Sequence, residues 1–356
     1  MLNYPLRFIA DNLRRSLNIA SAPFLVNYSL TLRCNLNCKY CGVSQLENNY
    51  AQEELTASEI STFLDDRELK KLDVIVITGG EPFLKEDFTQ ILLEFKKKTS
   101  ARIFHITTNG FLTEKIIESV RFLKSKGLLI DIKVSIDDTD EKHDRLRGKV
   151  GSFRNAIATL EKLRDIFKKK EIFIGINQTI YQDNYQSITE VKKIAKSLNV
   201  VYLGFVGLKQ RALYSNTQAS DYSLVDLSQA ARQFVRAELT RGGPKITKIK
   251  SFSELIENAV IQHYTKVQCN LLYNDQAVGG RRRCMNLFSH FRLNPNGDII
   301  TCSYDIEPLG NIREKSYSKI LEKQRTKAKL SQVKSCGKCW LGCEVTPSWV
   351  SSLCLG

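Results

Sequence analysis

Apolar runs alternate with segments of helical hydrophobic spacing from about residue 26 to residue 206. The apolar runs are bounded by turn-forming residues and predict strands. Segments between them, such as the one opened by the capping-box sequence Thr56–Glu59 and the one that follows Ser152, predict helices. The predicted strands are Phe24–Leu32, Leu72–Ile77, Arg102–Thr107, Leu128–Ile136, Ile172–Ile180 and Val200–Val206.

Six strand–helix repeats joined by right-handed crossovers favour an α/β fold, a partial TIM-like (β/α)6 barrel. A doubly wound sheet has the same local pattern and stays open as an alternative. The fourth predicted strand alternates, because Asp131, Lys133 and Ser135 are interleaved with isoleucine and valine. In a barrel this polar row would face the lumen, and Ser135 and Asp137 would lie at its catalytic rim.

The flanking segments differ from the barrel region. A stripe of apolar residues from Leu6 to Leu17 predicts an amphipathic helix packed on the protein, with an interfacial role left open. After residue 268 the chain becomes loop-rich, and Phe291–Leu293 and Asp298–Thr301 around the turn Asn294–Gly297 predict a hairpin. We therefore expect an N-terminal helix in 1–24, a barrel in 25–215, a helical connector in 216–268 and a separate cysteine-rich domain in 269–356.

The charge and hydropathy of the chain indicate which partners the protein would bind and where in the cell it would lie. The net charge is +15, but the short lysine and arginine runs lack the aromatic interleaving of a nucleic-acid module. We expect no specific nucleic-acid partner, and a membrane surface is not favoured. The chain shows neither a signal peptide nor an apolar run of the ~20 residues that cross a bilayer. These features predict a cytoplasmic protein.

The ten cysteines are grouped rather than scattered. Three lie between residues 34 and 41, and seven lie after residue 268. Without an export signal such a count indicates metal or redox chemistry and not a disulfide framework. The four histidines, His105, His143, His263 and His290, form no group with ligand spacing and are interpreted as structural.

The first cysteine group is the C-x3-C-x2-C loop of Cys34, Cys38 and Cys41. Three thiolates this close in sequence can hold three corners of a [4Fe–4S] cluster and leave one iron open to another ligand. A zinc ion with a remote fourth ligand is the alternative. The spacing favours the iron–sulfur cluster.

This loop, with Tyr40 at its aromatic position, resembles the signature of the radical S-adenosylmethionine (SAM) superfamily. The resemblance implies that SAM binds the open iron of the cluster. An electron from the cluster then cleaves SAM, and the 5′-deoxyadenosyl radical abstracts a hydrogen atom from a substrate. Flavodoxin or ferredoxin would donate the electron.

Other motifs match the family in the same order. Thr78–Pro82 resembles the Gly-Gly-Glu-Pro turn, whose glycines are expected to let the backbone approach the ligand. Glu81 would accept hydrogen bonds from the SAM ammonium, Ser135 and Arg147 would bind the carboxylate, and Tyr40 would contact adenine. The SAM contacts implied by the resemblance are Tyr40, Gly79, Gly80, Glu81, Thr107, Asn109, Ser135, Asp137 and Arg147.

The late cysteines resemble the SPASM and Twitch extensions of this superfamily, which carry auxiliary [4Fe–4S] clusters. Cys284, Gly297 and Cys302 have the spacing that opens such a domain. The second half departs from full SPASM, because it reads C-x2-C-x3-C instead of C-x2-C-x5-C-x3-C. We therefore expect one auxiliary cluster. Its ligands would be Cys284, Cys302, Cys336 and Cys339, and Cys343, Cys354 and Cys269 are additional candidates that would allow a second.

Three function classes follow from this resemblance. The expected one is a radical SAM oxidoreductase that oxidises or otherwise modifies a peptide or protein, assisted by the auxiliary cluster. The second is a dehydrogenase or epimerase acting on a sugar, alcohol or lipid precursor. The third is an iron–sulfur or zinc interaction protein without turnover. The catalytic acid or base is not identified by sequence; Asp305 and Cys354 are the candidates.

Overall fold

The computed structural model describes residues 13, 17, 22–43, 54–167, 171–206, 227–241, 284–302 and 305–336. Its centre is a curved parallel sheet in which consecutive strands are neighbours. The six strands are β1 (Leu25–Thr31), β2 (Val74–Gly79), β3 (Ile103–Thr108), β4 (Leu129–Ser135), β5 (Ile172–Ile180) and β6 (Val201–Val206). A doubly wound sheet would reverse its strand order, so the partial barrel is confirmed and the alternative is wrong.

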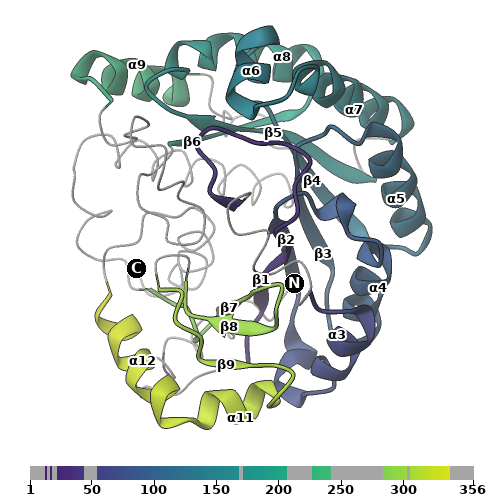
Figure 1. The fold of residues 1–356 in the computed structure, drawn as a ribbon, viewed down its shortest axis with the longest axis vertical. Coiled ribbons are helices and arrows are strands. Elements are labelled where there is room, and N and C mark those ends of the chain that lie inside the picture. Colours follow the sequence, from purple (N-terminus) through teal and green to yellow (C-terminus); the bar gives the residue numbers. More distant parts are fainter. Residues whose placement is uncertain are drawn as a thin grey trace.

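The described helices between residues 57 and 240 lie along the outer, convex side of this sheet (Figure 1). They are α3 (Ala57–Phe63), α4 (Phe88–Lys98), α5 (Thr113–Ser125), α6 (Asp140–Arg147), α7 (Ser152–Ile166), α8 (Ile188–Ser197) and α9 (Gln229–Thr240), with short 3-10 turns at Arg67–Lys71, Pro82–Leu84 and Tyr185–Ser187. The predicted capping box opens α3, because the Glu59 amide donates to Thr56 Oγ1 at 3.2 Å. Ser152 is the first residue of α7 instead of preceding it, and its hydroxyl donates to Asp144 at 2.8 Å.

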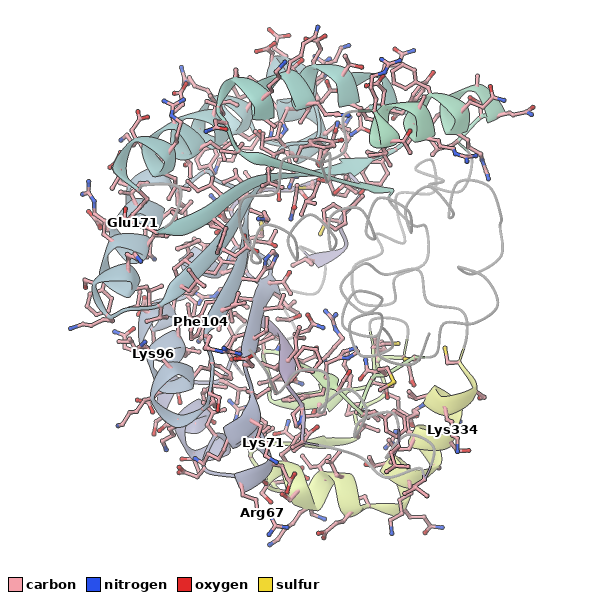
Figure 2. All side chains as sticks on the ribbon, turned by 180° about the vertical axis from the view of Figure 1, so that it is seen from behind. Arg67, Lys71, Lys96, Phe104, Glu171 and Lys334 are labelled. Carbon is pink, nitrogen blue, oxygen red and sulfur yellow. The ribbon has the colours of Figure 1, made fainter. Side chains whose placement is uncertain are left out.

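The main core fills the space between sheet and helices. Every second residue of β3 and β4, including Phe104, Ile130 and Ile132, is fully buried there. Figure 2 shows Phe104 between the sheet and the outer helices, whereas Lys96 and Glu171 lie at the outer surface. The other side chains of these strands therefore point into the lumen of the barrel.

The C-terminal elements join the same sheet. The predicted hairpin forms as β7 (His290–Leu293) and β8 (Asp298–Ile300), followed by β9 (Gly310–Asn311), α11 (Tyr317–Glu322) and α12 (Gln324–Ser335). β7 pairs in parallel with β1, which extends the sheet to nine strands. The sequence pattern predicted the hairpin but not this partner.

Aromatic packing and one ion pair also connect the C-terminal elements to the barrel. The centroid of the Phe291 ring lies 6.3 Å from the ring centroid of Phe63 in α3 and 4.8 Å from that of Tyr317 in α11. Arg313 Nε contacts Glu59 Oε1 at 2.5 Å. The hairpin is therefore tied to the first strand and the first described helix of the barrel.

Several predictions lie mostly outside the described residues. Of the predicted N-terminal stripe, only Leu13 and Leu17 are described; a backbone hydrogen bond of 3.0 Å joins them, and both side chains are exposed. Of the predicted connector, only residues 227–241 are described, and they contain α9. None of the described helices is long and apolar enough to span a bilayer.

Candidate functional site

A pocket lies at the carboxyl ends of β2, β3 and β4. The loop after β1 forms one wall and contributes all three early cysteines. The lining residues are Cys34, Leu36, Cys38, Tyr40, Cys41, Val43, Thr78, Gly79, Gly80, Thr107, Thr108, Asn109, Ser135 and Arg147. Ligands bind to α/β sheets at this end of the strands, so the pocket is the candidate functional site.

The three early cysteines and most of the residues expected to contact SAM line this pocket. Glu81 and Asp137 are the exceptions, because both are fully buried and lie outside its lining. Thr108, which belongs to the Thr107–Gly110 element expected to shape the pocket, also lines it, whereas Leu36 and Val43 were not predicted from the sequence. Their position next to the recognised motifs is the only signal that could have found them.

The two glycines of the β2 turn hold the cysteine loop. A β-carbon on Gly79, whose φ is +128°, would lie 2.1 Å from the Thr31 carbonyl oxygen. One on Gly80 would lie 2.1 Å from the Arg33 carbonyl oxygen. The Gly80 amide donates to Thr31 at 2.7 Å. These glycines therefore permit close contact between two backbone segments of the protein, besides lining the pocket.

The end of α6 contacts the opposite side of the cysteine loop. Gly148 caps this helix in the left-handed region, and a β-carbon there would lie 2.1 Å from the Asn37 carbonyl oxygen. The Lys39 amide donates to the Leu146 carbonyl at 3.0 Å. The loop is thus fixed between the β2 turn and the C-terminus of α6.

Glu81 organises the end of β3 from behind the pocket. Its carboxylate accepts hydrogen bonds from Thr108 Oγ1 and the Asn109 amide, both at 2.7 Å, and from the Phe83 amide at 3.3 Å. Burial raises the pKa of this carboxyl to about 7, although these donors oppose the shift. Asn109 in turn donates to Asn35 Oδ1 at 2.8 Å and lies 3.8 Å from Cys34 Sγ.

Asp137 plays a similar part at the end of β4. Its carboxylate accepts hydrogen bonds from the Tyr40 hydroxyl and, at 2.9 Å, from the Thr179 amide. It also pairs with Arg147 Nη2 at 2.9 Å. The Tyr40 ring packs against the Tyr181 ring at 4.6 Å. The Asp137 carboxylate thus holds two side chains that line the pocket, Tyr40 and Arg147.

Burial favours the neutral, protonated form of two of the three early thiols. Burial raises the pKa of Cys34 to about 12 and also raises that of Cys38, where the Arg147 guanidinium opposes the shift. Binding to iron would deprotonate such thiols, and soft thiolates are the ligands that these clusters use. In the described parts of the chain, no three Cys, His, Asp or Glu side chains form a group that could hold a single metal ion.

A charged triad lies in the lumen beneath the pocket. His105 Nδ1 lies 2.7 Å from Asp131 Oδ2, and the Lys133 ammonium pairs with the other oxygen. Burial raises the pKa of Asp131, but the cations beside it hold the net value well below its usual range. His105 was interpreted as a structural residue from sequence. The alternation in β4 did point to Asp131 and Lys133, but a strand pattern does not reveal a neighbour on β3.

The described late cysteines lie before β7 (Cys284), just after β8 (Cys302) and at the C-terminal cap of α12 (Cys336). The Cys284 amide donates to the Cys336 carbonyl at 3.3 Å, and the Asp305 amide donates to the Cys302 carbonyl at 3.2 Å. Asp305 is paired with Lys329 at 2.7 Å. The six described cysteines form no disulfide. The other predicted ligands and candidates, Cys269, Cys339, Cys343 and Cys354, lie outside the described residues.

Two protein-family models match the chain. The radical SAM superfamily model matches residues 28–195, and the SPASM model, an iron-sulfur cluster-binding domain, matches residues 284–340. These two domains imply a SAM-binding [4Fe–4S] cluster, SAM and auxiliary clusters. The first match contains the pocket, and the second contains the described late cysteines.

Individual relatives agree with these matches. An AdoMet-dependent heme synthase of Methanosarcina barkeri is 27% identical over 337 residues, which cover 92% of this chain and 90% of that protein. The subtilosin biosynthesis protein AlbA of Bacillus subtilis is 29% identical over 184 residues, or 49% of this chain and 37% of AlbA.

Among solved structures, Streptococcus suis SuiB bound to its precursor peptide SuiA has the same fold. The TM-score is 0.61 at 16% identity, over 91% of this chain and 70% of SuiB. The fold agrees with the two family models, which show a radical SAM superfamily domain at residues 28–195 and a C-terminal SPASM domain at residues 284–340 of this chain.

Proposed function

We propose that this protein reductively cleaves SAM and uses the 5′-deoxyadenosyl radical to abstract a hydrogen atom from a substrate. The observation that carries this proposal is the pocket, which joins three thiols to the ends of three strands. Cys34, Cys38 and Cys41 would hold the cluster. A bound cluster supplies the electron, and the protein supplies binding, orientation and exclusion of water.

The pocket residues would hold SAM as follows. Ser135 and Arg147 bind its carboxylate, and Tyr40 contacts its adenine. Thr107, Asn109 and the backbone of Gly79 and Gly80 complete the walls. In this proposal Glu81 and Asp137 act indirectly, since each uses its carboxylate to fix pocket residues.

The late cysteines would hold one auxiliary [4Fe–4S] cluster, on Cys284, Cys302, Cys336 and Cys339. Such a cluster can accept an electron, which makes the net reaction an oxidation. We retain the proposed division into a helix in 1–24, a barrel in 25–215, a connector in 216–268 and the SPASM domain in 269–356. The positive net charge would suit an acidic electron donor such as flavodoxin or ferredoxin.

The substrate would lie in the lumen next to the triad of His105, Asp131 and Lys133. A peptide or protein substrate is supported by three relatives: AlbA, the sporulation killing factor maturation protein SkfB of Bacillus subtilis, and SuiB with its precursor peptide. AlbA and SkfB match about half of this chain.

A carboxylated small molecule is the second candidate. The heme synthase relative matches almost the whole of both chains, and further relatives are named Fe-coproporphyrin III synthase and pre-heme d1 synthase. A tetrapyrrole with acidic side chains would suit a lumen that contains Lys133 and His105. The sugar, alcohol or lipid precursor expected from the sequence stays the other small-molecule candidate.

Anaerobic reconstitution with iron and sulfide, followed by dithionite and SAM, tests the proposed chemistry. We expect 5′-deoxyadenosine by liquid chromatography and mass spectrometry, and none from the Cys34→Ala variant. A loaded protein that never forms this product would overturn the proposal and favour the non-catalytic class. Parallel incubations with iron coproporphyrin III and with SuiA-type peptides then separate the two substrate classes, through the mass change of each.

A further inference from the structure

One buried guanidinium contacts two parts of the site that have different tasks. Arg147 Nη1 lies 3.9 Å from Cys38 Sγ, and Nη2 pairs with Asp137 at 2.9 Å. Arg147 is 7% exposed and also lines the pocket. Its Nε is buried and has no hydrogen-bond partner among the described residues. One side chain therefore has one nitrogen at a cysteine, one at the Asp137 carboxylate and a third that is buried without a partner among the described residues.

The backbone fixes this arrangement. Arg147 is the last residue of α6, and the residues beside it hold the cysteine loop. The Leu146 carbonyl accepts the Lys39 amide at 3.0 Å, and Gly148 packs on Asn37. Lys39 and Asn37 flank Cys38 in sequence. The spacing between the guanidinium and the Cys38 sulfur is thus set by main-chain contacts on both sides of each residue.

A cation beside a cluster thiolate favours the more negative, reduced cluster, and hydrogen bonds to sulfur are an established means of tuning such potentials. Asp137 is a fixed anion that opposes this effect through the same guanidinium. The two charges should therefore act on the cluster with opposite signs.

We propose that Arg147, held by Asp137, is a positioning residue that raises the reduction potential of the early cluster through its contact with Cys38. This inference rests on the proposed function, which places that cluster on Cys34, Cys38 and Cys41. The binding of the SAM carboxylate by Arg147 already belongs to the proposed function.

The measurement is a redox titration of the reconstituted protein, followed by the electron paramagnetic resonance signal that changes when SAM is added. We expect Arg147→Gln to lower the midpoint potential and Asp137→Asn to raise it. The double variant, which leaves no unpaired buried charge, should fall between the two. Where Arg147→Gln folds poorly, the comparison of the double variant with Asp137→Asn still isolates the guanidinium, and the double variant should have the lower potential.

Lys149→Met is the matched control for a general charge effect. Lys149 also lies at the cysteine loop, but its Nζ contacts the Asn35 carbonyl at 3.0 Å and the Phe111 ring, not a sulfur. Its removal should shift the potential less than Arg147→Gln does. Equal shifts in these two variants, or shifts of the same sign in Arg147→Gln and Asp137→Asn, would refute the tuning role.

SAM binding to the oxidised cluster gives an independent readout. Loss of a charge-assisted contact should weaken SAM binding by about 10- to 100-fold in Arg147→Gln. Arg147→Lys should recover part of the affinity, because it keeps the charge but not the fork of donors. If wild-type protein cleaves SAM and Arg147→Gln binds it unchanged with an unchanged potential, this inference fails while the proposed function stands.

Discussion

Gly148 packs against Asn37 so closely that a β-carbon on the glycine would lie 2.1 Å from the asparagine carbonyl oxygen. The atom in the way belongs to the backbone of the cysteine loop and cannot rotate aside. Helix α6 and the loop that carries Cys38 must therefore move apart if any side chain is present at this position.

Gly148→Ala should accordingly lose the early cluster. We expect less bound iron after reconstitution and a lower melting temperature. Gly127→Ala is the matched control: its φ is +76°, close to the +66° of Gly148, but the nearest atom to its β-carbon is Lys96 Nζ at 3.6 Å. That variant should lose about 1 kcal/mol of stability from backbone strain and keep its iron. Equal iron contents in the two variants would contradict the docking role of Gly148.

Glu81→Gln should change how stability depends on pH. The pKa of Glu81 is about 7 in the folded protein against an ordinary value of 4.5. The folded state therefore binds the Glu81 proton more tightly than the unfolded state does. The stability that this proton adds to the folded state is fully present below pH 4.5 and is lost as the pH rises through 7. The wild type should lose about 3 kcal/mol relative to Glu81→Gln over this window.

Thermal unfolding at pH 5 and pH 8, followed by circular dichroism, measures this difference. The glutamine variant loses one hydrogen-bond acceptor at every pH, so only the change between the two pH values reports on Glu81. Parallel stability curves for wild type and variant would show that Glu81 is ionised across the whole range.

Lys133→Met should destabilise the barrel. Lys133 is buried, and its removal leaves the Asp131 carboxylate with His105 Nδ1 as its remaining partner in the triad. Breaking a buried pair from one side typically costs about 3–5 kcal/mol, but Asp131 is partly exposed, so we expect about 2 kcal/mol. Asp131→Asn in the same chain should recover part of that loss. Urea unfolding of both single variants and the double variant measures the coupling, and additive effects would show that the pair does not interact.

Replacing Cys34, Cys38 and Cys41 by alanine should leave only the auxiliary site. We expect about four irons per chain after reconstitution, as one [4Fe–4S] cluster requires. A count near eight would show two auxiliary clusters and bring Cys343, Cys354 and Cys269 in as ligands. A count near zero would show that the SPASM domain does not assemble a cluster of its own in this protein.

The strands could be predicted almost to the residue because their composition is strongly biased. The fifth predicted strand, Ile172–Ile180, matches β5 at both ends, and the other five barrel strands differ by two residues or fewer. These segments are rich in β-branched residues, are buried on the helix side and are bounded by turns. Local pattern is sufficient for such strands.

Contacts between distant residues were harder to foresee. Glu81 and Asp137 were expected in the pocket, and they lie behind it because each carboxylate is occupied by donors from neighbouring strands and loops. His105 meets Asp131 through the pairing of β3 with β4. The spacing of these residues along the chain does not predict their contacts, because the contacts depend on which side chains face each other after the sheet forms.

The parallel pairing of β7 with β1 has a consequence for any attempt to shorten this protein. Without residues 284–336, the main-chain groups of Leu25–Tyr28 that face β7 would lose their partners. An unprotected edge strand of this kind, with Val26 and Tyr28 in its sequence, is a template for intermolecular pairing. An isolated radical SAM domain from this chain should therefore aggregate, and its solubility would have to be restored by redesigning that edge.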